Sequence, residues 1–220
     1  MRPDGVTNHV ERIVTPNATV TSDDAFLRHV ENMRSGIMDA IDRILPMDPD
    51  FVIMGLSLEA FWDGVAGAEA LLDKVRARAG VDATMGSASI LAALPALGGP
   101  SRIALITPHR PLGDERVRAY FTEAGYRVRG LHSFNCETPL AIAQVSQDAL
   151  ADAIRDLNGP DVDAIVQVGT NLCMARLAAK AEAELGKPVV AINTATYWHA
   201  LRSCGIDDRI EGWGRLLADL

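Results

Sequence analysis

The sequence predicts an α/β fold with two pseudo-symmetric halves, each a parallel sheet flanked by helices. Short runs rich in Val and Ile alternate with longer segments of helical period, which is typical of a parallel sheet covered on both faces. A strand–helix unit also recurs in the second part of the chain. With 220 residues, 48% of them hydrophobic, the chain can bury one large core or two smaller ones.

The individual elements follow from these runs. The expected strands are 51–54, 81–85, 102–107, 127–131, 163–168 and 188–193. The expected helices are 23–45, 65–79, 88–97, 113–125, 147–157, 172–185 and 195–204. Five helices are followed by a glycine that can adopt the left-handed cap conformation, namely Gly80, Gly98, Gly125, Gly186 and Gly205.

The internal repeat is the most informative pattern. Segment 50–58 resembles 163–172, and downstream 80–98 resembles 186–205. We therefore expect two copies of one βαβα unit, divided at the turn-forming cluster Gly98-Gly99-Pro100. The first half is residues 1–99, with the C-terminal segment 205–220 packing back on it, and the second half is residues 100–204.

Composition excludes several classes of function. A net charge of −8 gives no basic surface for nucleic acid or anionic membranes, and no run approaches the ~20 apolar residues that span a bilayer. The N-terminus lacks the apolar core of a signal peptide, so a cytoplasmic location is expected. Three cysteines without Cys-x-x-Cys spacing indicate neither a disulfide framework nor a zinc site, and no dinucleotide fingerprint is present. We expect no cofactor and no metal.

The repeated glycine turns form the candidate binding site. Ligands of open α/β sheets bind beyond the carboxyl ends of the strands, where backbone N–H groups can receive a carboxylate or an oxyanion. If the halves pack as a pseudo-symmetric pair, the two turns face each other across one cleft. Otherwise these residues only make tight turns and N-caps. The candidate substrate-binding residues are Gly55, Leu56, Ser57, Gly169, Thr170 and Asn171.

Two residues are candidates for proton transfer. His109 follows the strand 102–107, and a histidine that titrates near neutral pH suits a proton donor; a solvated loop histidine is the alternative. Cys136 lies in the loop after the strand 127–131 and is either a reactive thiol or a packing residue. Cys173 and Cys204 are expected to pack in the interior.

Two acidic residues near the first glycine turn could also have a functional role. Glu59 and Asp63 lie four residues apart on an expected helix after Gly55, so they share a face and could form a proton-transfer pair or a weak metal site. Carboxylates near a carboxylate-binding turn would repel the substrate, and a first helical turn favours acidic residues without any function. The structural interpretation is therefore preferred for both.

At these residues the sequence resembles the aspartate/glutamate racemase superfamily. The similar segments are 54–64, 104–108, 168–172 and 184–201, and the similar branch holds arylmalonate decarboxylase, maleate cis-trans isomerase and an ectoine-utilisation protein. The resemblance implies the racemase-like fold and acid–base chemistry by a cysteine at the carbon next to a carboxylate.

The chain departs from that family pattern in three ways. The positions where relatives carry the cysteines are Gly55 and Gly169, so the usual cysteine mechanism is not carried over. His109 stands where the decarboxylase and the isomerase have a tyrosine. The chain also begins after the segment that forms a first strand in relatives, so we expect the first half to lack that strand, with a truncated gene sequence as the favoured reason.

The resemblance implies a cofactor-independent isomerase or decarboxylase that acts on a small carboxylate or dicarboxylate. The competing class is a carboxylate-binding or regulatory protein that kept the fold and lost the chemistry, and a hydrolase that uses Ser57 is a third alternative. Two similar halves with short linkers also favour a homo-oligomer.

Overall fold

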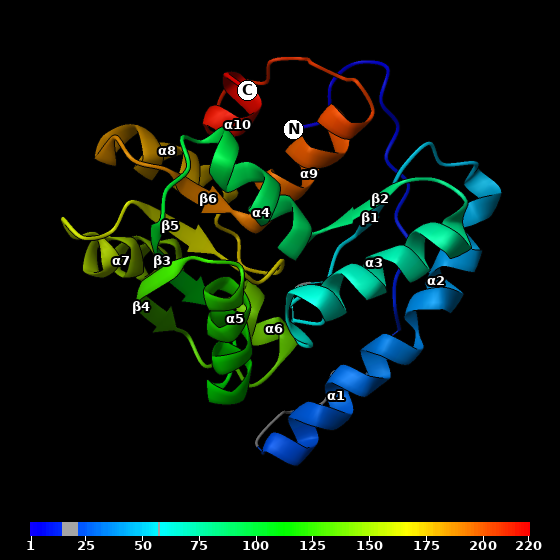
Figure 1. Ribbon diagram of the computed structural model, residues 1–220, viewed down its shortest axis with the longest axis horizontal. Coiled ribbons are helices and arrows are strands. Elements are labelled where there is room, and N and C mark those ends of the chain that lie inside the picture. The colour runs from blue at the N-terminus through cyan, green and yellow to red at the C-terminus, as the bar shows by residue number, and fades with distance from the viewer. Residues whose placement is uncertain (15–21, 57) are drawn as a thin grey trace.

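The computed structural model describes residues 1–14, 22–56 and 58–220, and these form two parallel sheets with helices around them (Figure 1). The larger sheet has the strand order β4-β3-β5-β6, and the smaller one pairs β1 with β2. The strands are β1 (Val52–Met54), β2 (Ala83–Met85), β3 (Arg102–Thr107), β4 (Arg127–Ser133), β5 (Ala164–Gln167) and β6 (Val189–Ala191).

Helices connect the strands, so that both halves follow the order strand, helix, strand, helix. In the first half this unit is β1-α3-β2-α4, and in the second it is β5-α8-β6-α9. The helices are α1 (Asp23–Ser35), α2 (Ile37–Ile44), the 3-10 helix η1 (Leu45–Met47), α3 (Gly64–Ala79), α4 (Gly86–Ala96), α5 (Pro111–Glu123), α6 (Pro139–Ala143), α7 (Gln147–Leu157), α8 (Ala175–Leu185), α9 (Ile192–Ser203) and α10 (Arg215–Ala218).

Strand β3 shows how the large sheet is buried on both faces. Ile103 and Leu105 belong to a central core, whereas Ala104 and Ile106 belong to a second core with residues of α7 and α8. All four side chains are 0% exposed. This burial explains why the strand reads as a continuous apolar run instead of an alternating one.

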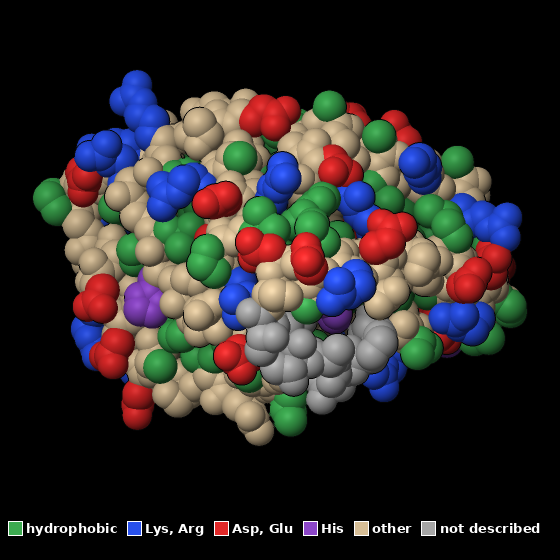
Figure 2. All heavy atoms as spheres, turned by 90° about the horizontal axis from the view of Figure 1, so that it is seen from below, with side chains coloured by type: hydrophobic (Ala, Val, Ile, Leu, Met, Phe, Trp, Pro, Cys, Tyr) green, Lys and Arg blue, Asp and Glu red, His purple; other side chains and the backbone are tan. Residues whose placement is uncertain are grey.

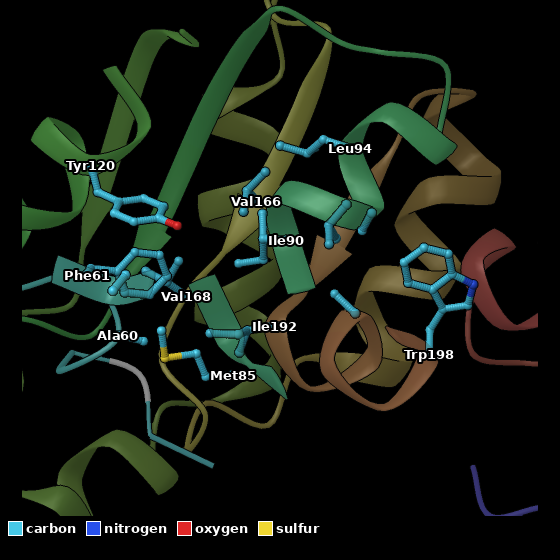
Figure 3. Packing of buried hydrophobic residues seen from close by; sticks show 14 of the residues in the cluster. Ala60, Phe61, Met85, Ile90, Leu94, Tyr120, Val166, Val168, Ile192 and Trp198 are labelled. Carbon is cyan, nitrogen blue, oxygen red and sulfur yellow. The ribbon is translucent and has the colours of Figure 1, made fainter. Parts of the chain in front are cut away.

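The central core joins the two sheets. Met54 and Met85 of the small sheet share one apolar cluster with Leu105 and Val166 of the large sheet. Figure 3 shows Met85 and Val166 within this cluster, between helices of the two halves. Helices α4 and α9, which occupy equivalent places in the two units, pack against each other. The two halves are therefore built around common apolar side chains.

Most element boundaries agree with the sequence prediction. Strand 102–107 and helix 147–157 are found as expected, and the five predicted cap glycines all have positive φ angles. The expected helix 23–45 is wrong, because Gly36 caps α1 and the chain starts a second helix, α2. The last long helix begins at Ile192 rather than 195, directly after β6, which shortens the expected strand.

The C-terminal segment contacts the helices of the second unit. The backbone N–H of Arg215 donates to Glu182 of α8 at 2.7 Å, and the Arg202 side chain of α9 donates to the Leu220 carbonyl at 3.0 Å. Leu216 and Leu217 enter the central core, which holds residues of both halves. The division of the chain at Gly98-Gly99-Pro100 stays a prediction.

Charges on the surface are mixed. On the face that Figure 2 shows, acidic and basic side chains are interspersed. Among the helices that the structure describes, none is long and apolar enough to cross a membrane.

Candidate functional site

A cavity of about 250 Å³ lies beyond the carboxyl ends of β1, β3 and β5. Its walls come from α1, from the loops after β1, β3, β4 and β5, and from α6. This is the edge of parallel strands where ligands of α/β proteins bind. The lining residues are Phe26, His29, Met33, Leu56, Leu58, Glu59, Pro108, His109, Arg110, Cys136, Glu137, Thr138, Pro139, Ile142, Gly169, Thr170 and Asn171.

The cavity gathers most of the residues that the sequence singled out. Leu56 from the first turn and Gly169, Thr170 and Asn171 from the second line the same space, together with His109 and Cys136. The two turns touch, because the Thr170 hydroxyl donates to the Gly55 carbonyl at 3.3 Å. Ser57 lies outside the described residues. The two turns therefore face one concavity, and the roles assigned to their residues stay predictions.

Side chains around the second turn fix its shape. Gln167 at the end of β5 donates from Nε2 to the carbonyls of Val168 and Gly169, at 2.8 and 2.7 Å. Asn193 donates to the Thr170 carbonyl at 2.9 Å, and Asn171 donates to the Pro139 carbonyl at 2.6 Å. The bonds from Gln167 and Asn193 use carbonyl groups of the turn, and the bond from Asn171 ties the turn to α6.

The amide groups of the same turn remain available. Among the residues that the structure describes, the backbone N–H groups of Thr170 and Asn171 have no hydrogen-bond acceptor. Amides that follow a glycine with φ +104° and line a cavity suit an anionic oxygen.

Neither glycine turn is followed directly by a helix, and α8 begins later than the expected residue 172. Segment 59–63 is a series of turns before α3 begins at Gly64, and α8 begins at Ala175. The expectation that Glu59 and Asp63 share a helical face is therefore wrong. Cys173 lies before α8 and is exposed rather than packed in the interior. Any anion site at these turns depends on the local amides and not on a helix N-terminus.

His109 is buried in the wall of the cavity, at 7% exposure, and its Nε2 atom has no hydrogen-bond partner within residues 1–14, 22–56 and 58–220. Burial lowers the pKa of its imidazole to about 4. The expected titration near neutral pH is therefore not found: the ring is uncharged at pH 7. Its backbone is held by Thr107 and Ser133, whose hydroxyl groups pair with the His109 N–H and carbonyl.

Cys136 is half-buried, and its backbone N–H donates to the Pro108 carbonyl at 2.9 Å. Burial raises the pKa of its thiol, which keeps it protonated at neutral pH. The pKa of Cys204 is also raised by burial, yet the residue as a whole is exposed, so the expectation of interior packing is wrong there. Neither thiol has the environment of a reactive thiolate.

Glu59 is the residue that sequence reasoning set aside and the structure places in the site. It lines the cavity at 2% exposure, and no other residue that the structure describes donates a hydrogen bond to its carboxyl oxygens. Burial raises the pKa of this carboxyl group to about 7, although its own backbone N–H and, more weakly, the Arg34 guanidinium oppose the shift. Asp63 is half exposed and forms an ion pair with Arg34 at 2.5 Å, so the two carboxylates do not act as a pair.

A signal for Glu59 was present in the sequence. It is the single charged residue in the run Leu58-Glu-Ala-Phe-Trp62, whose apolar members are all buried. Helix α1 packs on this run, with the Phe26 and Trp62 rings 5.7 Å apart. The burial of this run thus depends in part on a contact with a segment distant in sequence.

No metal centre is evident in the part of the chain that the structure describes. No group of three or more His, Cys, Asp or Glu side chains there is arranged to hold a metal ion.

Solved structures of two enzymes have folds similar to that of this chain. A liganded double mutant of arylmalonate decarboxylase matches with a TM-score of 0.81 and 26% identity, over 93% of this chain and 86% of that chain. Nocardia farcinica maleate cis-trans isomerase with a covalently bound succinylcysteine intermediate matches with a TM-score of 0.84 over 92% and 83%, and at 21% identity it shows the fold alone. The fold and the cavity thus define an α/β protein of the aspartate/glutamate racemase class.

Sequence comparison narrows the class. The family model described as arylmalonate decarboxylase matches residues 49–217. The arylmalonate decarboxylase of Bordetella bronchiseptica is 32% identical over 167 residues, which are 74% of this chain and 69% of that protein. The chain therefore belongs to the arylmalonate decarboxylase family.

Maleate isomerases match a shorter part of the chain than the decarboxylase does. The Nocardia farcinica maleate isomerase is 31% identical over 118 residues, which are 53% of this chain and 47% of that protein. The chain thus matches about half the length of this relative.

Proposed function

We propose that this protein is a cofactor-independent enzyme that acts at the carbon next to the carboxylate of a small carboxylic or dicarboxylic acid, as a decarboxylase or an isomerase. Neither strand-end turn carries the cysteine that the family resemblance implies, because both positions are glycine, Gly55 and Gly169. The relatives are named for arylmalonates and for maleate, which are small dicarboxylates. Their names support a substrate of that class.

One observation carries this proposal. The two glycine turns meet through Thr170 and Gly55 at a cavity of about 250 Å³, and the amides of Thr170 and Asn171 are available to a carboxylate there. A pocket of this size suits a small molecule with a single ring or less. Its other walls are largely apolar, which leaves room for the organic part of such an acid.

A substrate panel in deuterated buffer tests the proposal. The purified protein is incubated with phenylmalonate, methylmalonate and maleate, and products and deuterium incorporation are followed by NMR. We expect turnover of one of these acids. Decarboxylation of a malonate places solvent deuterium at the carbon next to the remaining carboxylate, and isomerisation of maleate gives fumarate. Saturable binding of the panel without turnover or exchange would contradict the enzyme proposal.

The alternative is a carboxylate-binding protein without catalysis. Two observations favour it: both family cysteine positions are glycine, and the pKa of Cys136 is raised. Thermal-shift measurements separate the two functions, since a ligand that binds only the folded state raises its melting temperature. Stabilisation by a dicarboxylate with no product formed would favour the binding protein.

Assembly and location belong to the same proposal. We propose a cytoplasmic protein that forms a homo-oligomer, needs no cofactor and binds neither nucleic acid nor membranes. Size-exclusion chromatography with light scattering measures the oligomeric state.

A further inference from the structure

Glu59 is buried in the cavity wall without a donor from any other described residue. The side chain is 2% exposed, and apart from its own backbone N–H no described group holds its carboxyl oxygens. Burying an unpaired carboxyl group destabilises a fold, because the water that solvated it is lost without replacement. Packing alone does not offset this cost, whereas a hydrogen bond to a ligand bound in the cavity does.

A second buried glutamate in the same chain shows how a carboxylate with a structural role is stabilised by a hydrogen bond. Glu182 is 6% exposed, and its carboxylate accepts the backbone N–H of Arg215 at 2.7 Å. Among the described residues no other residue donates to Glu59 in this way, and Arg34, the cation that acts on its charge, is paired with Asp63. The contrast indicates that the hydrogen-bond partner of Glu59 is a ligand bound in the cavity.

We propose that the Glu59 carboxyl group transfers the proton at the reacting carbon of the bound acid and so replaces the thiol that is missing from both strand-end turns. This inference rests on the proposed function, since it names the catalytic residue of that site. The turn at Gly169 would hold the substrate carboxylate, while Glu59 reaches the cavity from the turn that follows β1.

The step balances for the decarboxylation of a malonate. The bond between the central carbon and one carboxylate breaks, its electron pair stays on that carbon and spreads into the remaining carboxylate, and CO₂ leaves. The O–H bond of Glu59 then breaks and its proton forms the new C–H bond. Glu59 is left as a carboxylate, and it regains a proton from water.

The ionisation of Glu59 fits this role. With a pKa of about 7, the group holds both protonation states at neutral pH, which suits a general acid or base. Its protonated form is uncharged and does not repel a substrate carboxylate. This removes the objection that an acidic side chain is unsuited to a carboxylate-binding pocket.

The other titratable groups around the cavity do not replace it. Burial lowers the pKa of both His29 and His109, so neither ring supplies a cation readily at neutral pH. Arg34 and Arg110 carry positive charge, and Glu137 is exposed at the rim. Glu59 is therefore the group best placed to change its proton occupancy near pH 7.

The test compares three variants on the malonate that the wild-type protein decarboxylates, phenylmalonate or methylmalonate. Glu59→Gln keeps the size of the side chain but removes the ionisable proton, and Glu59→Asp keeps the carboxyl group on a shorter stem. Glu115→Gln, on the exposed surface of α5, is the matched control. The readouts are kcat, KM, the pH profile and the thermal shift that the substrate produces.

We expect Glu59→Gln to lower kcat by about 100-fold or more with KM changed by less than about threefold, as for loss of a general acid. The limb of the pH profile near pH 7 should disappear with it, and Glu115→Gln should behave as the wild type. A substrate-induced thermal shift in Glu59→Gln shows that the variant is folded and binds.

Two results would overturn the inference, and they differ. If the wild type converts the substrate and Glu59→Gln keeps its rate, the role of Glu59 is wrong while the proposed function stands. If the wild type binds the whole panel but converts none of it, both fail together. Should Glu59→Gln not fold, the pH profile of Glu59→Asp decides: the limb near pH 7 should move with the altered carboxyl group, and a limb that stays where the wild type has it contradicts the proposal.

Discussion

The two glycine turns at the strand ends are equivalent in sequence but differ in the space around them. At Gly55 the φ angle lies outside the left-handed range, and an added Cβ would meet nothing within 4 Å. At Gly169 φ is +104°, and a Cβ would lie 2.6 Å from the Pro108 ring. The first turn therefore leaves open space beside its glycine, whereas the second is closely packed around its glycine.

The residues that follow extend this difference. Four positions after the glycine, the first turn carries the buried Glu59 and the second carries the exposed Cys173. The leucines one position earlier, Leu58 and Leu172, are buried in both. Both copies of the repeat therefore bury a leucine after the turn, whereas the polar residue that follows this leucine differs in type and in burial.

The largest effect expected on stability concerns Glu59. Its pKa rises from 4.5 to about 7 on folding, so the folded state binds the proton more tightly than the unfolded chain. Stability from this group is complete below pH 4.5 and is lost as the pH rises through 7, by roughly 3 kcal/mol. Glu59→Gln should remove this loss, measured as the difference in unfolding free energy between wild type and variant at pH 4.5 and pH 8.

A constant difference between wild type and Glu59→Gln across that pH range would mean that the carboxyl group is solvated and that the two turns differ less than described. Glu115→Gln provides the baseline, because its side chain is exposed.

The next effect separates the two glycines directly. Gly169→Ala should destabilise the fold by about 2 kcal/mol, since alanine is strained at positive φ and its methyl group would overlap Pro108. Gly55→Ala should change stability by less than about 0.5 kcal/mol, as for an unobstructed surface position. Urea unfolding of both variants measures the contrast, and equal losses would refute it.

A smaller effect is expected for the contact between the turns. Thr170→Val removes the hydroxyl that donates to the Gly55 carbonyl, and it should cost about 1 kcal/mol or less. Thr122→Val, which removes an exposed hydroxyl on α5, is the control. The thermal shift with phenylmalonate should also fall in Thr170→Val, and an unchanged shift would show that the contact does not shape the binding turn.

The smallest effect is expected for a restored thiol at the open turn. Gly55→Cys should be tolerated within about 0.5 kcal/mol because the position is unobstructed. Iodoacetamide labelling followed by mass spectrometry then reports whether the new thiol is accessible. A loss of stability like that of Gly169→Ala would show that the first turn is as tightly packed as the second.

Local patterns and the strand order made much of the site predictable. The strand at 102–107 and the cap glycines depend on neighbouring residues, and the carboxyl ends of parallel strands meet by topology, which places Leu56 and Thr170 together. The ionisation of the site was not predictable in the same way. The pKa values of Glu59 and His109 depend on burial, and α1 packs on Leu58 and Trp62 from a distant part of the chain.

Because Met54 and Met85 share their apolar neighbours with Leu105 and Val166, the halves cannot swing apart without exposing that interior to water. The pocket is thus preformed and does not open and close by movement of one half against the other. Selection among substrates would then fall to the loop side chains that rim it, and unfolding should proceed as one cooperative transition instead of two.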